Sequence, residues 1–300
     1  MRPGLVIQQG ETGFMYDSLC AAQIPDQLQS VAAAITQDKI QLPSLPDLVK
    51  HIRDEIASPN STARSVAKLV AHDPSLAATI LRFANSPLYG SATAAKTLPV
   101  AVQRLGLNLV SSLTLATISR QLFHASSAWT DAQLARVWKH SVRTAGISQA
   151  LAPQFGVDPD LALLAGLLHD VGSLVMLVHM ENTPSLFINK DRLDCLLFAT
   201  RTEAGLSLAR HWNLPLDVTQ TIQSHNVITK PEMANPVLVS DVVRAASWFS
   251  TEVALQGDMV ADQRKNALAR LGFDPKHDLL ADPSILRQVD TIVRLLRGDS

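Results

Sequence analysis

The sequence predicts an all-α protein, and three observations lead to this prediction. Asp-Pro pairs, which are typical of helix starts, occur at Asp73-Pro74, Asp158-Pro159 and Asp282-Pro283. The Asp side chain accepts hydrogen bonds from the first free amides, and Pro at the first helical position needs no donor. Apolar residues also recur at helical spacing, as at Leu48 and Ile52. Finally, the sequence contains no Asn-Gly or Asp-Gly hairpin signal and no sustained alternation of β-branched residues.

The first half of the chain is predicted as short helices followed by a long apolar stretch. A capping-box pattern at Ser44–Asp47 precedes the first apolar-periodic run. The stretch Leu105–Phe123 is so apolar that exposing it would create too large a hydrophobic patch. We therefore expect it to be a shared spine between an N-terminal helical subdomain, residues 1–128, and a second helical bundle, residues 129–300.

Within that half, Leu98–Ile118 has the pattern of a helix-turn-helix with Gly106 as the turn. The segment in the place of the recognition helix, Asn108–Ser119, holds no Lys or Arg. It therefore lacks the groups that contact phosphates and read guanine edges. We expect this segment to lie in a core rather than on DNA.

The second half is predicted as longer helices. A capping-box pattern at Thr130–Gln133 indicates a helix over Asp131–Ala152, and the next helix runs from Pro159 toward Asp170. A final helix over Ser284–Arg297 has one apolar face.

Composition excludes several classes of protein. Lys and Arg number 26 against 27 Asp and Glu, so the formal net charge of -1 leaves no surplus of positive charge for nucleic acid or anionic membranes. A hydrophobic content of 47% argues against disorder. The longest apolar stretch, Leu161–Leu168, is followed at once by His169 and Asp170, so we expect no membrane span. With no export signal, and with Cys20 and Cys195 in no CxxC pattern, we expect a cytoplasmic protein without disulfides.

One local motif has chemical content, the segment Gly166–Gly172 with His169-Asp170 at its centre. Burying this pair is costly unless both groups have partners. His140 on the preceding helix and Asp241 in an apolar segment offer a second imidazole and a second carboxylate. Such a set suits a six-coordinate Mn, Fe, Ni or Mg ion, whose bound water would act as a nucleophile on phosphate esters. The alternative is that His169 and Asp170 hydrogen-bond each other and nearby caps, with His140 a core or interface histidine.

These residues resemble the H…HD…D set of the HD superfamily of metal-dependent phosphohydrolases, and in particular its HDOD branch, which is regarded as regulatory and non-catalytic. The ordered stretches that carry the resemblance extend from about residue 41 to residue 249. They are Leu42–Pro46, His72–Leu76, Ala84–Gly90, Ala101–Gly106, Ala165–Val175, His211–Pro215 and Ile222–His225. Residues 1–40 and 251–300 lie outside the resemblance. The resemblance implies an HD-like helical bundle for the second subdomain.

The sequence also departs from the catalytic relatives. HD-GYP proteins carry HDxGK, whereas Ser173 stands here in the place of the lysine, so a cation that would neutralise a phosphate is missing. The paired histidine of those relatives reads His225-Asn226 here, and a histidine expected before Gly205 is absent. The resemblance thus implies a regulatory module that binds a signalling partner or a small ligand such as a nucleotide or cyclic dinucleotide. Asn85 and His225 are candidates for that surface, and a one-metal phosphohydrolase using His140, His169, Asp170 and Asp241 is the alternative.

Overall fold

The computed structural model describes residues 30–31, 33–35, 39–90, 93–123, 125–183, 190–224, 236–250, 265–274, 278 and 280–298. This part of the chain is helical and contains no strand, which confirms the predicted fold class. The side chains of both cysteines lie outside the described residues. In chain order the elements are α3 (Asp47–Ala57), α4 (Ala63–Val70), α5 (Pro74–Ala84), α6 (Leu98–Leu122), α7 (Ala128–Leu151), the 3-10 turn η1 (Ala152–Phe155), α8 (Pro159–Leu168), α9 (Val171–Glu181), α10 (Lys190–His211), α11 (Leu216–Ser224), α12 (Val239–Ser250) and α14 (Pro283–Arg297).

The Asp-Pro pairs do begin helices. The carboxylates of Asp73, Asp158 and Asp282 each accept hydrogen bonds from amides in the first turns of α5, α8 and α14. The two predicted capping boxes are wrong. Helix α7 begins earlier, with Ser127 accepting from the Thr130 amide, and α3 begins after Pro46 without a side-chain cap. In α7 the actual cap, Ser127, lies three residues before the predicted one, because local patterns do not fix a helix start to the exact residue.

Helix α6 is bent at Gly106, whose φ of 77° and ψ of 162° are not helical. The predicted turn therefore exists, but the segment after it is largely buried, as the absence of basic residues predicts. Leu109 and Leu113 pack into a hydrophobic cluster with α4 and α5, whereas Leu115 and Ile118 pack into a second cluster with α9 and α10. Helix α6 thus contributes to both clusters.

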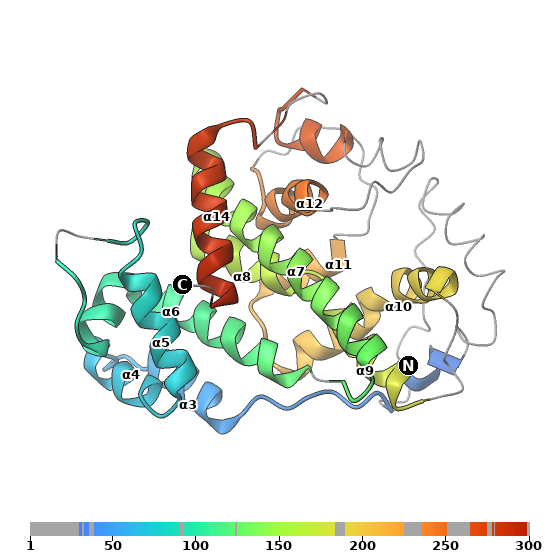
Figure 1. Cartoon of the computed structure of the whole chain (residues 1–300), viewed down its shortest axis with the longest axis horizontal. Helices are drawn as coiled ribbons and strands as arrows, with labels where there is room; N and C mark the ends of the chain where they lie inside the picture. Colours follow the sequence, from blue (N-terminus) through green and yellow to red (C-terminus); the bar gives the residue numbers. More distant parts are fainter. Residues whose placement is uncertain are drawn as a thin grey trace.

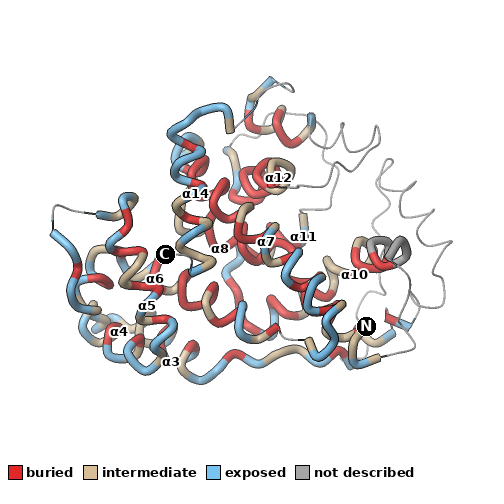
Figure 2. Tube along the Cα trace, viewed as in Figure 1, coloured by how far each residue is buried: buried red, intermediate tan, exposed pale blue. Residues whose placement is uncertain are grey.

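Helix α7 lies at the centre of the molecule, with α8, α12 and α14 packed along it (Figure 1). Helices α3–α6 form one end and α9 and α10 the other, whereas α11 lies beside α8 and α12 (Figure 1). Buried positions concentrate on α8, α9, α12 and the second half of α7 (Figure 2). The residues that carry chemistry lie where these central helices meet.

One sequence expectation needs correction. The segment Pro159–Glu181 contains α8 and α9. By length and composition alone, it is long and apolar enough to cross a membrane. The apolar character resumes after the His169-Asp170 pair, which was expected to end it. In the protein, 89% of the most apolar stretch of this segment is buried, so its side chains pack inside the fold.

Two segments far apart in the sequence, one around α3 and one at the end of α10, are joined by hydrogen bonds. The Trp212 indole donates from Nε1 to the carbonyl of Pro43 at 2.7 Å. The Arg53 guanidinium donates to the carbonyls of Trp212 and Asn213, both at 2.6 Å. Because these carbonyls follow the last turn of α10, Arg53 satisfies acceptors that a helix end leaves open. The contacts hold the end of α10, which carries part of the site, against α3 and the segment just before it.

Candidate functional site

His169 and Asp170 lie at the break between α8 and α9. Helix α8 ends at Leu168 and α9 begins at Val171, so the pair occupies the two positions between them. His169 is 1% exposed and Asp170 is 7% exposed. Both polar groups are therefore out of bulk water and need partners within the protein.

His169 and His140 face each other. Their Nε2 atoms are 3.2 Å apart, and their ring centroids are 5.1 Å apart. On the far side of the His169 ring, Nδ1 lies 2.8 Å from the carbonyl oxygen of Gly166. The structure thus brings together two of the four residues that the sequence proposed as metal ligands.

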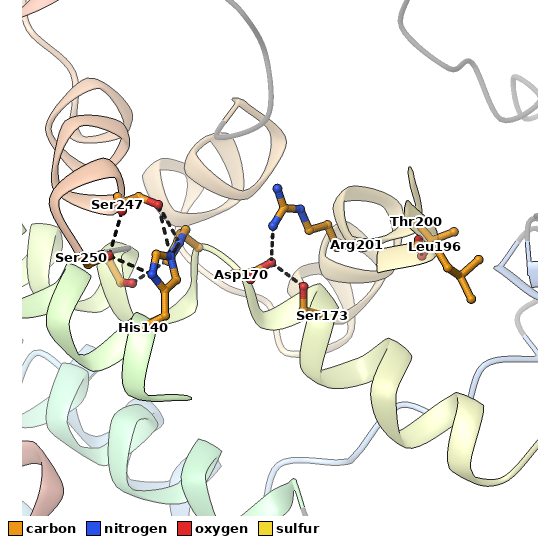
Figure 3. A network of polar contacts seen from close by, with 10 residues as sticks. His140, Asp170, Ser173, Leu196, Thr200, Arg201, Ser247 and Ser250 are labelled. Carbon is orange, nitrogen blue, oxygen red and sulfur yellow. Dashed lines mark hydrogen bonds and ion pairs between the residues drawn. The ribbon is translucent and has the colours of Figure 1, made fainter. Parts of the chain in front are cut away.

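Helix α12 supplies two hydroxyls to this pair, and Figure 3 shows both beside His140. Ser250 Oγ lies 2.9 Å from His140 Nδ1, and Thr144 Oγ1 lies 2.6 Å from Ser250 Oγ. Ser247 Oγ lies 3.2 Å from His140 Nε2 and 3.5 Å from His169 Nε2. Every ring nitrogen of the two histidines therefore has a neighbour within hydrogen-bonding distance.

The charge of His140 is set mainly by burial. Desolvation lowers the pKa of His140 below its ordinary value, because the charged imidazolium loses its hydration. The nearby Asp170 carboxylate opposes this effect and Arg201 reinforces it.

The Asp170 carboxylate faces Ser173 and Arg201 (Figure 3). Ser173 Oγ donates to Oδ1 at 2.7 Å, and the Arg201 guanidinium lies 3.5 Å from the same oxygen. Gly172 makes this possible, since a Cβ at that position would overlap the carbonyl oxygen of Arg201. Gly172 thus allows α10 to approach the start of α9 closely.

Asp241 has other partners. Its Oδ1 accepts from Arg270 Nε at 2.6 Å, its Oδ2 lies 3.3 Å from the second Arg270 nitrogen, and Arg244 is 4.0 Å away. Oδ2 also accepts from the amide of Leu238 at the start of α12, at 3.1 Å. Asp241 is 2% exposed. This differs from the predicted ligand role, because Asp241 closes the first turn of α12 and anchors a segment beyond it.

The four predicted ligands therefore do not form one donor set. Among the described residues, no group of three or more His, Cys, Asp or Glu side chains is arranged to hold a metal ion. The 3.2 Å between the two Nε2 atoms suits a shared ion, because two nitrogens about 2.1 Å from one ion and about 90° apart are about 3 Å from each other. The four residues together therefore do not fit the predicted metal centre. Metal binding by the two histidines stays a prediction.

Asn85 and His225 were the predicted ligand or partner surface. The Asn85 amide is used inside the fold: it donates from Nδ2 to the carbonyl of Ala95 at 3.1 Å and accepts from the Ala95 amide at 2.7 Å. Asn85 directly follows the last residue of α5, so its side chain ties the end of this helix to the segment before α6. His225 lies outside the described residues.

A second polar cluster joins the segment after α5 to α7 and α8. Gln149 Nε2 on α7 donates to the hydroxyl of Tyr89 at 2.6 Å and lies 3.5 Å from the carboxylate of Asp160 on α8. Partial burial raises the pKa of Asp160 to about 6, with a smaller contribution from the charge of Asp158. Burial, together with Asp160, raises the pKa of Tyr89 as well.

Sequence reasoning did not find Arg201, Ser247, Ser250 or Arg270. Each lies far along the chain from the residue that it contacts: 31 positions separate Arg201 from Asp170, and 110 separate Ser250 from His140. Local sequence pattern contains no signal for these contacts. A second arginine, Arg244, lies 4.0 Å from Asp241 within α12.

Comparisons with known sequences find one domain family. A sequence model of the HDOD domain matches residues 42–228. An uncharacterized protein of Treponema pallidum is 28% identical over 231 residues, which cover 72% of this chain and 44% of that protein. Ribonuclease Y of Thermus thermophilus is 30% identical over 139 residues, 46% of this chain and 21% of that enzyme. The chain thus spans less than half the length of these relatives.

Solved structures share the fold. A candidate metal-dependent phosphohydrolase of Shewanella amazonensis matches with a TM-score of 0.80 at 23% identity, covering 93% of this chain and 99% of that one. An HDOD domain protein of Geobacter sulfurreducens, of unknown function, matches with a TM-score of 0.60 at 23% identity, with 91% and 99% covered. A candidate signal transduction protein of Marinobacter aquaeolei matches with a TM-score of 0.57 at 24% identity, with 92% and 66% covered. At these identities the likeness establishes the helical architecture.

Proposed function

Since this chain belongs to the HDOD family, we propose that it is a regulatory module that binds a signalling partner or a small ligand and performs no catalysis. One observation carries the proposal: the polar groups of the H…HD…D set are engaged with other protein groups. His140 and His169 face each other, Asp170 is paired with Arg201, and Asp241 is paired with Arg270. A hydrolytic metal site instead needs ligands that converge on one ion and leave a position open for water.

Arginine pairing supports the same interpretation. Both carboxylates already have a guanidinium beside them, so their negative charge is balanced without a metal ion. Ser173 donates to Asp170 where catalytic relatives have a lysine, and a neutral hydroxyl supplies no charge to a phosphate. Both features favour binding over turnover.

The experiment compares the purified chain with Asp170→Ala. Each protein is incubated with Mn, Fe, Ni or Mg and assayed on bis-p-nitrophenyl phosphate and on a cyclic dinucleotide. We expect the same background rate from both proteins. Metal-dependent turnover that disappears in Asp170→Ala would overturn the non-catalytic proposal.

Ligand binding is measured separately, by calorimetry with cyclic dinucleotides and guanine nucleotides. Saturable heat with an unchanged nucleotide after the titration supports a small-ligand module. No heat with any of them counts against a nucleotide ligand and in favour of a protein partner.

A one-metal phosphohydrolase is the second candidate, favoured by the 3.2 Å separation of the two Nε2 atoms. This function predicts that the purified protein retains or takes up Mn, Fe or Ni, and that His140→Ala abolishes the uptake. The measurement is elemental analysis after metal loading and desalting, with His179→Ala on α9 as a histidine control. A wild-type protein that takes up none of these metals rules the candidate out.

A further inference from the structure

A carboxylate without a cationic partner lies where α8 begins. Asp160, in the first turn of α8, is partly exposed, and no arginine or lysine forms an ion pair with it among the described residues. The hydrogen bond that its Oδ1 receives from Gln149 Nε2 is long, at 3.5 Å. The fold therefore holds a negative charge partly out of water with little to balance it.

The described groups around Asp160 bring no positive charge to it. Burial, together with the charge of the exposed Asp158, raises the pKa of Asp160 to about 6. Helix α6 contributes Ser112, whose hydroxyl lies 3.3 Å from the main-chain carbonyl of Asp160, and η1 contains no ionisable residue. Oδ1 of Asp158 already accepts from the amides of Asp160 and Leu161. Asp160 is thus the carboxylate that a ligand would meet here.

A buried acceptor lies beside this carboxylate. Gln149 is 6% exposed, and its Nε2 lies 2.6 Å from the Tyr89 hydroxyl and 3.5 Å from Asp160 Oδ1. Its Oε1, on the same amide group, is buried and has no hydrogen-bond partner in the described part of the chain. An amide oxygen buried without a donor loses the hydrogen bonds that it makes in water. The cluster therefore favours a ligand that brings both a positive charge and several N–H donors.

We propose that Asp160, Gln149 and Tyr89 form a docking site for an arginine side chain of a protein partner. A guanidinium is planar and always charged, and it carries five N–H donors in a fixed fork. Two of these donors suit the two oxygens of Asp160, and others remain for the oxygens of Gln149 and Tyr89. The inference rests on the partner-binding part of the proposed function, but the docking site shares no residue with the histidine pair.

A protein partner suits this site better than a free small molecule does. One guanidinium makes few contacts, and in a free molecule these contacts alone must offset the loss of translational and rotational freedom on binding. An arginine fixed in a larger interface shares that loss with the contacts around it. Because Tyr89 follows α5 whereas Gln149 and Asp160 belong to α7 and α8, the bound side chain would contact both parts of the molecule at once.

The test titrates the full-length, ¹⁵N-labelled protein with N-acetyl-arginine-methylamide, which models an arginine within a polypeptide. We expect saturable shifts of the Gln149 side-chain amide signals, which are identified by their loss in Gln149→Met. Asp160→Asn should weaken the binding by about 10- to 100-fold, because it removes the charged acceptor. Asp131→Asn, at an exposed carboxylate in the first turn of α7, is the control and should bind as the wild type does.

The pH dependence gives a second readout. Only the charged form of Asp160 attracts a guanidinium, so a pKa of about 6 makes the affinity about tenfold lower at pH 5 than at pH 7. This difference should vanish in Asp160→Asn.

Three other probes decide between occupants of the site. The citrulline analogue, which has the same shape without the charge, should not bind at Asp160. Unmoved Gln149 signals with the arginine compound, equal binding by Asp160→Asn, or equal binding of the citrulline analogue would overturn the proposal. Spermidine or Mg²⁺ binding at Asp160 more tightly than the arginine compound would also overturn it, in favour of a free polyamine or a metal ion. The metal and nucleotide assays of the proposed function do not probe Asp160, so either result can fail without the other.

Discussion

Replacing Arg270 by alanine would leave the Asp241 carboxylate, 2% exposed, without its main partner. Breaking a buried ion pair from one side costs about 3–5 kcal/mol, because an uncompensated charge remains inside the protein. Two features reduce that figure here: the Arg270 side chain is 22% exposed, and Arg244 lies 4.0 Å from the same carboxylate. We therefore expect the free energy of unfolding to fall by about 2–3 kcal/mol.

Urea unfolding followed by circular dichroism measures this change, and a double-mutant cycle identifies its cause. Asp241→Asn removes the buried charge that Arg270→Ala leaves unpaired. The loss of unfolding free energy in the double variant should therefore be smaller than the sum of the two single losses, by about 1–3 kcal/mol. Arg64→Ala is the matched control, because Arg64 is an exposed arginine on α4, and its effect should stay within about 0.5 kcal/mol. If Arg270→Ala is no more destabilising than Arg64→Ala, or if the two changes are additive, Asp241 does not anchor the C-terminal segment.

Three other substitutions test the core, the helix crossing and the acidic cluster. Leu113 is fully buried in the spine, so Leu113→Asp should give insoluble protein and Leu113→Ala should lose about 2–5 kcal/mol in urea unfolding; unchanged stability would refute the spine assignment. Gly172→Ala forces a Cβ against the Arg201 carbonyl and should cost about 3 kcal/mol, and a wild-type melting temperature would contradict that contact. The raised pKa of Asp160, about 6 instead of 3.8, means that the fold disfavours its charged form, so this stability is present below about pH 4 and lost as pH rises through 6. Asp160→Asn should thus be more stable than the wild type by about 1 kcal/mol at pH 7, after allowance for solvent screening, and equally stable near pH 4; a constant difference would refute the shift.

The sequence predicted features whose cause is local. An Asp before a Pro caps a helix through atoms two or three residues away, so Asp73, Asp158 and Asp282 were assigned correctly. Gly106 was also assigned correctly as a turn, because a positive φ is a property of one residue. The absence of basic residues after Gly106 correctly placed the following segment in a core.

The partners of the site residues depend on tertiary packing, which local pattern does not contain. Asp241 looked like a metal ligand because a carboxylate in an apolar segment needs a positive partner, and that reasoning was sound. The partner is Arg270, 29 positions later and outside the matched domain. Nothing in the sequence distinguishes an arginine from a metal ion as the source of that charge.

The contacts of Arg270 also assign a role to the chain beyond residue 228. Ala267 and Leu268, which precede Arg270, pack in one hydrophobic cluster with Val242 and Ala245 of α12 and with Val289 of α14. Helix α12 carries Ser247 and Ser250 as well as Asp241, so the segment that anchors Asp241 also fixes the helix whose hydroxyls meet His140. Ser250, which contacts His140, lies at one end of α12, and Asp241, which contacts Arg270, lies near its other end. We therefore expect substitutions at Arg270 to alter ligand affinity at the histidines without contacting them, through the position of one helix.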